Sequence, residues 1–236
     1  MITGLVALQL KKRMIAAYQI ATERNQIVQM FGEHVSPAVV DTLLARDGDL
    51  KSEKQNVCVM FLDIRNFTAF AEKRSPEEVV DYLDTLFEFM IEIVNRHQGI
   101  INKFLGDGFM AVFGAPVSSG NNELNAVNAA REIIAEVDRR VAAAELPPSR
   151  VGIGLHAGDA VTGSIGSALR KEYTVIGDVV NLASRIEKLN KEFQSELLIS
   201  DVVLRAIPAA TKPDSVPRGQ VQIRGREMPV GIYQLA

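Results

Sequence analysis

The sequence contains little of what marks several specialised protein classes. A single cysteine, Cys58, excludes a disulfide within the chain, and it lies in an apolar run, as a reduced core thiol would. The three histidines, His34, His97 and His156, are too far apart in sequence for a metal-binding motif. The formal net charge is only −3, so the chain lacks the basic excess that would favour a nucleic-acid partner.

Long apolar runs are also missing, since none reaches the roughly 18 to 20 residues that a membrane helix needs. The apolar residues 1–10 are followed at once by Lys11, Lys12 and Arg13, whereas a secretion signal has its basic cluster first. This order fits the cytoplasmic end of a membrane helix, which would tether the chain to the inner face of a membrane, downstream of a sensor. It also fits an amphipathic start to a soluble helix, and both interpretations stay open.

Two regions of different character follow. Residues 1–50 are expected to form a separate signalling segment with a linker, because residues 5–31 lack proline and repeat apolar side chains loosely at helical spacing. Such a coiled-coil-like helix is marginal alone and needs a partner. Ser36 and Pro37 predict the start of a short second helix. Hydrophobic residues make up 47% of the chain, which is ordinary for a packed domain, and we expect that domain at 51–236.

Within the second region, short apolar runs typical of buried strands alternate with longer amphipathic stretches typical of helices. The expected strands are 57–62, 100–105, 109–113, 151–157, 160–165 and 196–200, and the expected helices are 76–97, 123–144 and 178–191. Turns are expected at Gly106–Gly108 and at Gly158-Asp159, and a Pro-containing loop at 211–219 precedes two short strands around Gly225. This order predicts an α+β fold: a ferredoxin-like βαββαβ core, with helices on one face of the sheet and a C-terminal extension.

Two aspartates occupy positions where this topology can bring them together. Asp63 directly follows the first expected strand, and Asp107 lies at the tip of the first hairpin. Each alone is ordinary turn chemistry. Adjacent carboxylates repel unless a cation neutralises them, and their oxygens suit Mg²⁺ or Mn²⁺, which also bind substrate phosphates. The pair therefore indicates a metal-assisted reaction at phosphorus, for which two metal ions are a known device.

A second pair, Asn181 and Arg185, shares one face of an expected helix. An arginine there can stabilise charge that develops on a phosphoryl group, and an ordinary surface arginine is the alternative. No Walker motif occurs, and Gly152-Ile-Gly154 is too short to indicate a dinucleotide site.

Four segments, in this order, resemble the catalytic domain of class III nucleotidyl cyclases of the bacterial adenylate cyclase type. The segments are Val59-Met-Phe-Leu-Asp63-Ile-Arg-Asn-Phe67-Thr68, Lys103-Phe-Leu-Gly106-Asp107-Gly108, Arg150-Val-Gly-Ile-Gly-Leu-His156-Ala-Gly158 and Tyr173-Thr174-Val-Ile-Gly177-Asp178-Val-Val-Asn181-Leu-Ala-Ser184-Arg185. The resemblance covers residues 52–236, and four motifs at family spacing make it specific.

The resemblance implies metal and transition-state roles. Asp63 and Asp107, with the backbone carbonyl of Ile64, match the ligands of two Mg²⁺ or Mn²⁺ ions. Asn181 and Arg185 match the pair that stabilises the transition state. In the resembling family the metal aspartates come from one subunit and the transition-state residues from the other, which implies a homodimer with two shared sites.

Further positions match residues that hold the substrate. Phe67 and Thr68 lie in the family's phosphate-contacting turn, and Arg150 and Arg224 match residues that hold the terminal phosphates. The chain departs from the family where Asn66 replaces the common glycine before Phe67.

Lys103 and Thr174 match the pair that reads the purine. Lysine carries only donors, so it can donate to N1 of adenine but would face the N1–H of guanine. Guanylate cyclases carry a glutamate at this position. The resemblance therefore implies an adenylate cyclase of a signal-transduction protein, which converts ATP to 3′,5′-cyclic AMP and pyrophosphate.

Three alternatives remain at this point. A guanylate cyclase is disfavoured by Lys103, and a diguanylate cyclase would need a Gly-Gly-acidic-acidic-Phe signature that is absent. A catalytically silent domain that binds nucleotide or a partner usually loses a metal aspartate or the Asn/Arg pair, and this chain retains all four residues.

Overall fold

The computed structural model describes residues 39, 41–42, 52–167, 170–222 and 228–235. The chain divides into two compact units, residues 1–49 and 50–236. The expected helix at 5–31 and most of the short second helix lie outside the described residues, although residues 39, 41 and 42 are helical. Within the described part, no helix is both long and apolar enough to cross a membrane.

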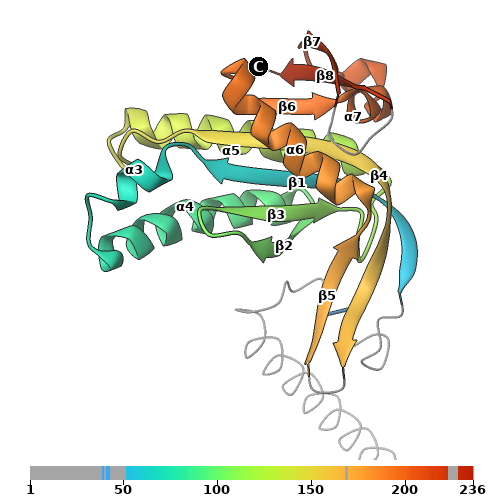
Figure 1. Cartoon of the computed structure of the whole chain (residues 1–236), viewed down its shortest axis with the longest axis horizontal. Helices are drawn as coiled ribbons and strands as arrows, with labels where there is room; N and C mark the ends of the chain where they lie inside the picture. Colours follow the sequence, from blue (N-terminus) through green and yellow to red (C-terminus); the bar gives the residue numbers. More distant parts are fainter. Residues whose placement is uncertain (1–38, 40, 43–51, 168–169, 223–227, 236) are drawn as a thin grey trace, which may run out of the picture. The chain divides into compact units, whose positions relative to one another are not determined.

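The second unit has the predicted ferredoxin-like core (Figure 1). Its elements follow in the order β1 (Glu53–Ile64), α4 (Pro76–Arg96), β2 (Gly99–Phe104), β3 (Gly108–Phe113), α5 (Asn122–Ala142) and β4 (Val151–Ser167). The strands are adjacent in the order β2-β3-β1-β4 and are antiparallel. β1 is therefore central, with β3 on one side and β4 on the other.

The C-terminal extension continues the same sheet. β6 (Leu197–Ser200) pairs with β4 in parallel, and β8 (Val230–Leu235) and β7 (Ser215–Val221) follow it in the sheet. The remaining described elements are α3 (Phe67–Ala71), β5 (Arg170–Ile176), α6 (Asp178–Phe193), α7 (Asp201–Ala206) and the 3-10 turn Ala209–Thr211. β7 begins inside the stretch that was expected to be a loop, and α7 was not expected.

The start of α4 shows how local sequence sets an element. The Ser75 hydroxyl accepts from the backbone N–H of Glu78 at 3.3 Å, and the Glu78 carboxylate accepts from the backbone N–H of Ser75 at 2.8 Å. Pro76 occupies the first helical position. This capping box satisfies two backbone donors that the helix itself leaves unpaired, which fixes the predicted helix start.

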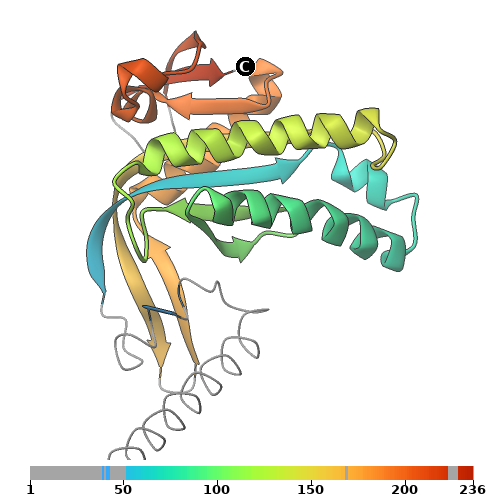
Figure 2. The same cartoon turned by 180° about the vertical axis from the view of Figure 1, so that it is seen from behind.

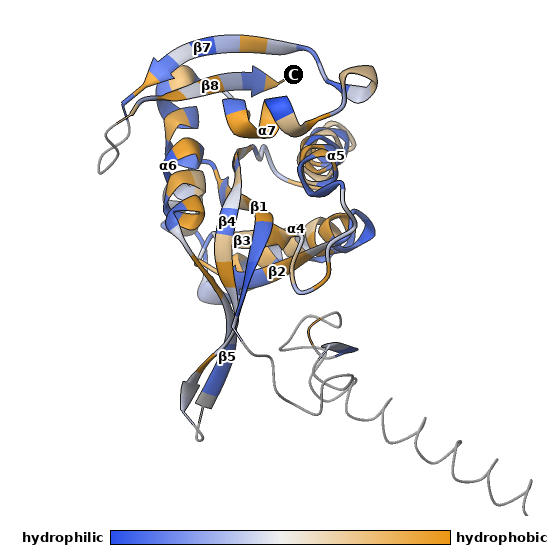
Figure 3. Cartoon of the chain, turned by 90° about the vertical axis from the view of Figure 1, so that its right-hand side faces the viewer, coloured by the Kyte–Doolittle hydropathy of each residue, from blue (hydrophilic) through white to orange (hydrophobic). Residues whose placement is uncertain are grey.

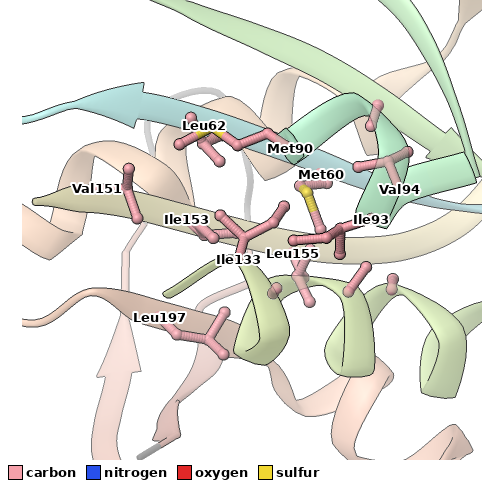
Figure 4. Packing of buried hydrophobic residues seen from close by; sticks show 14 of the residues in the cluster. Met60, Leu62, Met90, Ile93, Val94, Ile133, Val151, Ile153, Leu155 and Leu197 are labelled. Atoms are coloured by element: carbon pink, nitrogen blue, oxygen red, sulfur yellow. The ribbon is translucent and has the colours of Figure 1, made fainter. Parts of the chain in front are cut away.

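One large apolar core lies between the sheet and the helices α4 and α5, which lie side by side across one face (Figure 2). Figure 4 shows its side chains meeting from Met60 and Leu62 of β1, Met90, Ile93 and Val94 of α4, Ile133 of α5, Val151, Ile153 and Leu155 of β4, and Leu197 of β6. Burying each such side chain contributes about 1.5 to 3 kcal/mol. Cys58 is fully buried here, and burial raises the pKa of its thiol, as expected for a core cysteine.

Helix α6 lies on the opposite face of the sheet, so the expectation that the helices share one face is wrong for it (Figure 3). Leu182 and Ile186 of α6 pack with Leu198 of β6 in a second, smaller apolar cluster that also includes residues of β8. Successive residues of β6 enter different clusters, because Leu197 belongs to the large core and Leu198, on the opposite face of the strand, to the small one. The sheet therefore needs apolar residues on both faces near β6.

The expected turn at Gly158-Asp159 is wrong, because β4 runs unbroken through both residues. They pair with Val57 and Asn56 of β1. The Asp159 carboxylate accepts from Asn56 Nδ2 at 3.3 Å and pairs with Lys54 Nζ at 2.7 Å, so cross-strand contacts outweigh the turn propensity. β5, which was not expected, returns along the outer half of β4, and the two strands extend beyond the rest of the sheet (Figure 1).

Close packing of α6 on β4 generates a test. A Cβ on Gly154 would lie 2.5 Å from Cα of Glu187 and nearer still to its backbone nitrogen. Gly154→Ala should therefore force α6 away from the sheet and lower the free energy of unfolding by about 1 to 3 kcal/mol. Gly158→Ala is the matched control, because its Cβ would lie 3.7 Å from Val179, an ordinary contact. Equal melting temperatures for the two variants would contradict this packing.

Candidate active site

The end of β1 brings the two predicted aspartates together. Asp63 pairs in register with Gly108, the first residue of β3. The backbone N–H of Ile64 donates to the carbonyl of Asp107 at 3.1 Å, which ties the hairpin tip to the end of β1. A Cβ on Gly108 would collide with the carbonyl oxygen of Leu62, so only glycine allows this approach. The hairpin tip is thus held at one place beside Asp63.

The electrostatics of Asp63 reflect this proximity. Burial and, next, the neighbouring Asp107 carboxylate raise the pKa of Asp63, while the cations of Arg65 and Lys191 oppose the rise. Arg65 Nη1 lies 3.1 Å and Lys191 Nζ 3.8 Å from Asp63 Oδ2. Two partly buried carboxylates side by side form a negative site that favours a bound cation.

The donor set fits a metal that is completed by its substrate. The described residues contain no group of three or more His, Cys, Asp or Glu side chains that could hold a metal ion. Asp63 and Asp107 thus offer two carboxylates rather than a full cage. Mg²⁺ is commonly bound in this way, by one or two carboxylates together with water and substrate phosphates.

The turn after Asp63 holds the residues expected to contact phosphates. Asn66 has φ 60°, in the left-handed region, which explains why the resembling family commonly has glycine there. Asparagine tolerates this conformation better than most residues. Phe67 and Thr68 follow at once and open α3. The residues expected to meet phosphate therefore follow Asp63 by four and five positions, directly after the turn.

The backbone of Arg150 is hydrogen-bonded to this turn. Its carbonyl accepts from the N–H of Arg65 at 2.8 Å. Its guanidinium is exposed and pairs with Glu196, with Nε 2.8 Å from Oε1. Arg224 lies outside the described residues.

The two residues expected to read the purine lie on β2 and β5, which pair with β3 and β4 in the sheet and contact each other through side chains. Asn102 Nδ2 donates to the carbonyl of Tyr173 at 3.2 Å, and Lys103 Nζ lies 3.9 Å from Glu172 Oε1. These contacts bring Lys103 near the segment that carries Thr174. Sequence reasoning missed β5 and Glu172, since a strand that begins with Arg170-Lys-Glu has no apolar run to reveal it.

Asn181 and Arg185 lie on the first half of α6, four residues apart as predicted. Asn181 is exposed and Arg185 half-buried, whereas Leu182, Ile186 and Glu187 are buried. The helix therefore presents its Asn/Arg face away from the sheet.

The chain matches the family model of the adenylate and guanylate cyclase catalytic domain over residues 50–236. It is 37% identical over 185 residues to adenylate cyclase 1 of Rhizobium meliloti, covering 77% of this chain and 28% of that protein. It is equally similar, over 208 residues, to an uncharacterized protein of Mycobacterium tuberculosis, covering 88% of this chain and 36% of that protein. The chain thus spans well under half the length of these relatives.

Solved structures of cyclases have a similar fold. The adenylyl cyclase CyaB from P. aeruginosa superposes with a TM-score of 0.71 at 30% identity, covering 79% of this chain and 96% of that one. The guanylyl cyclase Cya2 superposes with a TM-score of 0.67 at 34% identity, covering 78% and 93%. The family match, the ferredoxin-like core and the paired aspartates agree, and the chain belongs to the class III adenylate and guanylate cyclase catalytic domain family.

Proposed function

We propose that this domain is an adenylate cyclase that converts ATP to 3′,5′-cyclic AMP and pyrophosphate. The observation that carries the proposal is the meeting of Asp63 and Asp107 at the end of β1. In the reaction, the ribose 3′-oxygen forms a bond to the α-phosphorus and the bond from that phosphorus to the bridging oxygen breaks, which releases pyrophosphate. The proton of the hydroxyl passes to a metal-ligating carboxylate or to the substrate itself.

Two Mg²⁺ or Mn²⁺ ions, held by Asp63, Asp107 and the carbonyl of Ile64, would lower the pKa of the 3′-hydroxyl and neutralise the triphosphate. The remaining work falls to the chain's own side chains. Arg185 and Asn181 stabilise the charge that develops at the α-phosphoryl group.

The phosphate chain is held by a different part of the protein. The turn at Phe67 and Thr68 contacts the phosphates, and Arg150 and Arg224 hold the terminal ones. Because Arg150 already pairs with Glu196, the triphosphate must share this guanidinium or displace the glutamate.

Base selectivity follows from the donors and acceptors of the purine pair. Lys103 donates to N1 of adenine, and the Thr174 hydroxyl accepts from the exocyclic amine. Guanine presents an N1–H to Lys103, and a buried donor left unpaired costs about 1 to 3 kcal/mol, or roughly tenfold or more in selectivity. The relatives include both adenylate and guanylate cyclases, so Lys103 carries this part of the proposal.

The active form is proposed to be a symmetric homodimer with two shared sites. The chain carries both the metal aspartates and the purine-reading and transition-state residues, so two copies suffice. Large apolar side chains at the β2–β3 hairpin and on β4 and β5 support a second copy, because about half of each is exposed: Phe104, Leu105, Val161, Ile165 and Ile176.

A direct assay tests the activity. Purified protein with Mn²⁺ and either ATP or GTP should release cyclic AMP from ATP, with products separated by chromatography. Asp63→Ala and Asp107→Ala should each reduce turnover by about a hundredfold or more, because each removes a metal ligand. Their fold should persist and can even gain stability, since the carboxylate repulsion is relieved. Activity within a few-fold of wild type in either variant would contradict the two-metal proposal.

Lys103→Glu tests the base contact. Glutamate accepts from N1–H and the amine of guanine, so the variant should lose about tenfold or more in kcat/KM for ATP and gain some GTP turnover. If the single variant loses ATP turnover without gaining GTP turnover, a second substitution at Thr174 should be combined with it to obtain GTP turnover. Full ATP selectivity in Lys103→Glu would mean that this residue does not read the base.

Complementation tests the shared sites. Asp107→Ala and Arg185→Ala proteins should each be inactive alone. When they are mixed, about half of the dimers are heterodimers with one intact site of two, so about a quarter of wild-type activity should return. Subunit exchange is confirmed separately with tagged chains. No recovery despite exchange would mean that each site is built within one chain.

A further inference from the structure

Arg65 sits between two carboxylates that sequence reasoning did not connect. Its Nη1 lies 3.1 Å from Asp63 Oδ2, and its Nη2 lies 2.9 Å from Glu187 Oε1 on α6. Nη2 also donates to the backbone carbonyl of Glu187 at 3.5 Å. The side chains of Arg65 and Glu187 are only 13% and 9% exposed. One guanidinium therefore joins the metal carboxylate to the inner face of α6.

Two glycines of β4 make room for this arrangement. A Cβ on Gly152 would overlap the Arg65 guanidinium, and a Cβ on Gly154 would collide with the backbone of Glu187. The Gly152-Ile-Gly154 motif, which is too short for a dinucleotide site, thus has a structural purpose: it gives Arg65 and α6 access to the sheet.

The geometry suits an outer-shell role. A metal-ligating carboxylate is usually hydrogen-bonded by a second residue that orients it. Arg65 contacts Oδ2 of Asp63, which orients the carboxylate beside Asp107. The planar fork of arginine can hold two carboxylates at once, which the single ammonium of lysine does less well. Lys191, the other cation at Asp63, is farther away and mostly exposed.

We propose that Arg65 is a positioning residue that orients the metal carboxylate of Asp63, and that Glu187 anchors Arg65 to the helix that carries Asn181 and Arg185. The inference rests on the proposed role of Asp63 as a metal ligand. Its consequence is that the metal site depends on a contact with α6 that touches neither metal nor nucleotide.

Mn²⁺ binding to the full chain, followed by the electron paramagnetic resonance signal of free Mn²⁺, tests the inference without relying on activity. Arg65→Ala should raise the Mn²⁺ Kd about 10- to 100-fold, the usual effect of losing an outer-shell partner. Arg65→Lys and Glu187→Gln should raise it less. The matched control is Arg140→Ala. Arg140 pairs with Glu136 within α5, where its Nε lies 2.7 Å from Oε1, and α5 lies on the other face of the sheet from α6. This variant should leave the Mn²⁺ Kd unchanged.

Thermal unfolding of each variant separates positioning from folding. Arg65→Ala leaves Glu187 buried without its partner, which is strongly destabilising. If that variant does not fold, Arg65→Met combined with Glu187→Gln removes both charges, and its Kd should still be raised at least tenfold. A folded Arg65→Ala variant, or the folded Arg65→Met and Glu187→Gln double variant, with a Kd within twofold of wild type, or tighter, would overturn the inference. Unchanged Mn²⁺ binding in Asp63→Ala would instead overturn the metal assignment itself.

Discussion

The pairing of β1 with both of its neighbours is the constraint on which the site depends. Near the C-terminal end of β1, Asp63 lies opposite Gly108 of β3 on one side and Gly152 of β4 on the other. Neither neighbour has a side chain, so the hairpin tip with Asp107 can approach from one side and the Arg65 guanidinium from the other. The large core under α4 and α5 holds β1 in this register, because a slip of one residue would turn Met60 and Leu62 out of it.

This strand register places the carboxylates of Asp63 and Asp107 side by side. Burial and the Asp107 carboxylate raise the pKa of Asp63, and Arg65 only partly offsets them. A site of this kind is stabilised by a cation and by the phosphates it carries, which connects the strand register to phosphoryl chemistry. The core that fixes the strand register thus also fixes the position of the two carboxylates that the proposed reaction uses.

Much of the fold could be predicted from the sequence because its signals are local. The helix start at Pro76 and the Gly106–Gly108 hairpin each depend on signals within a few residues, and both are confirmed. The Gly158-Asp159 turn was wrong because partners distant in sequence, Lys54 and Asn56, keep these residues in a strand.

The residues of the site also fall into those that local sequence could predict and those that depend on distant packing. Motif spacing pointed to Asp63 and Asp107, and the topology brings them together. The contacts of Arg65 with Glu187 and of Lys103 with Glu172 depend on how α6 and β5 pack, and no local pattern shows them. Arg65 could have been noticed as a cation two residues after Asp63, but its second partner lies 122 residues away.

A crystal structure of the full chain with Mn²⁺ and 3′-deoxy-ATP, which lacks the attacking hydroxyl, tests the central claim most directly. The anomalous signal of manganese should lie between the carboxylates of Asp63 and Asp107 of one protomer, with the adenine beside Lys103 and Thr174 of the other. Manganese bound elsewhere, with no metal beside Asp63 and Asp107, would contradict the account.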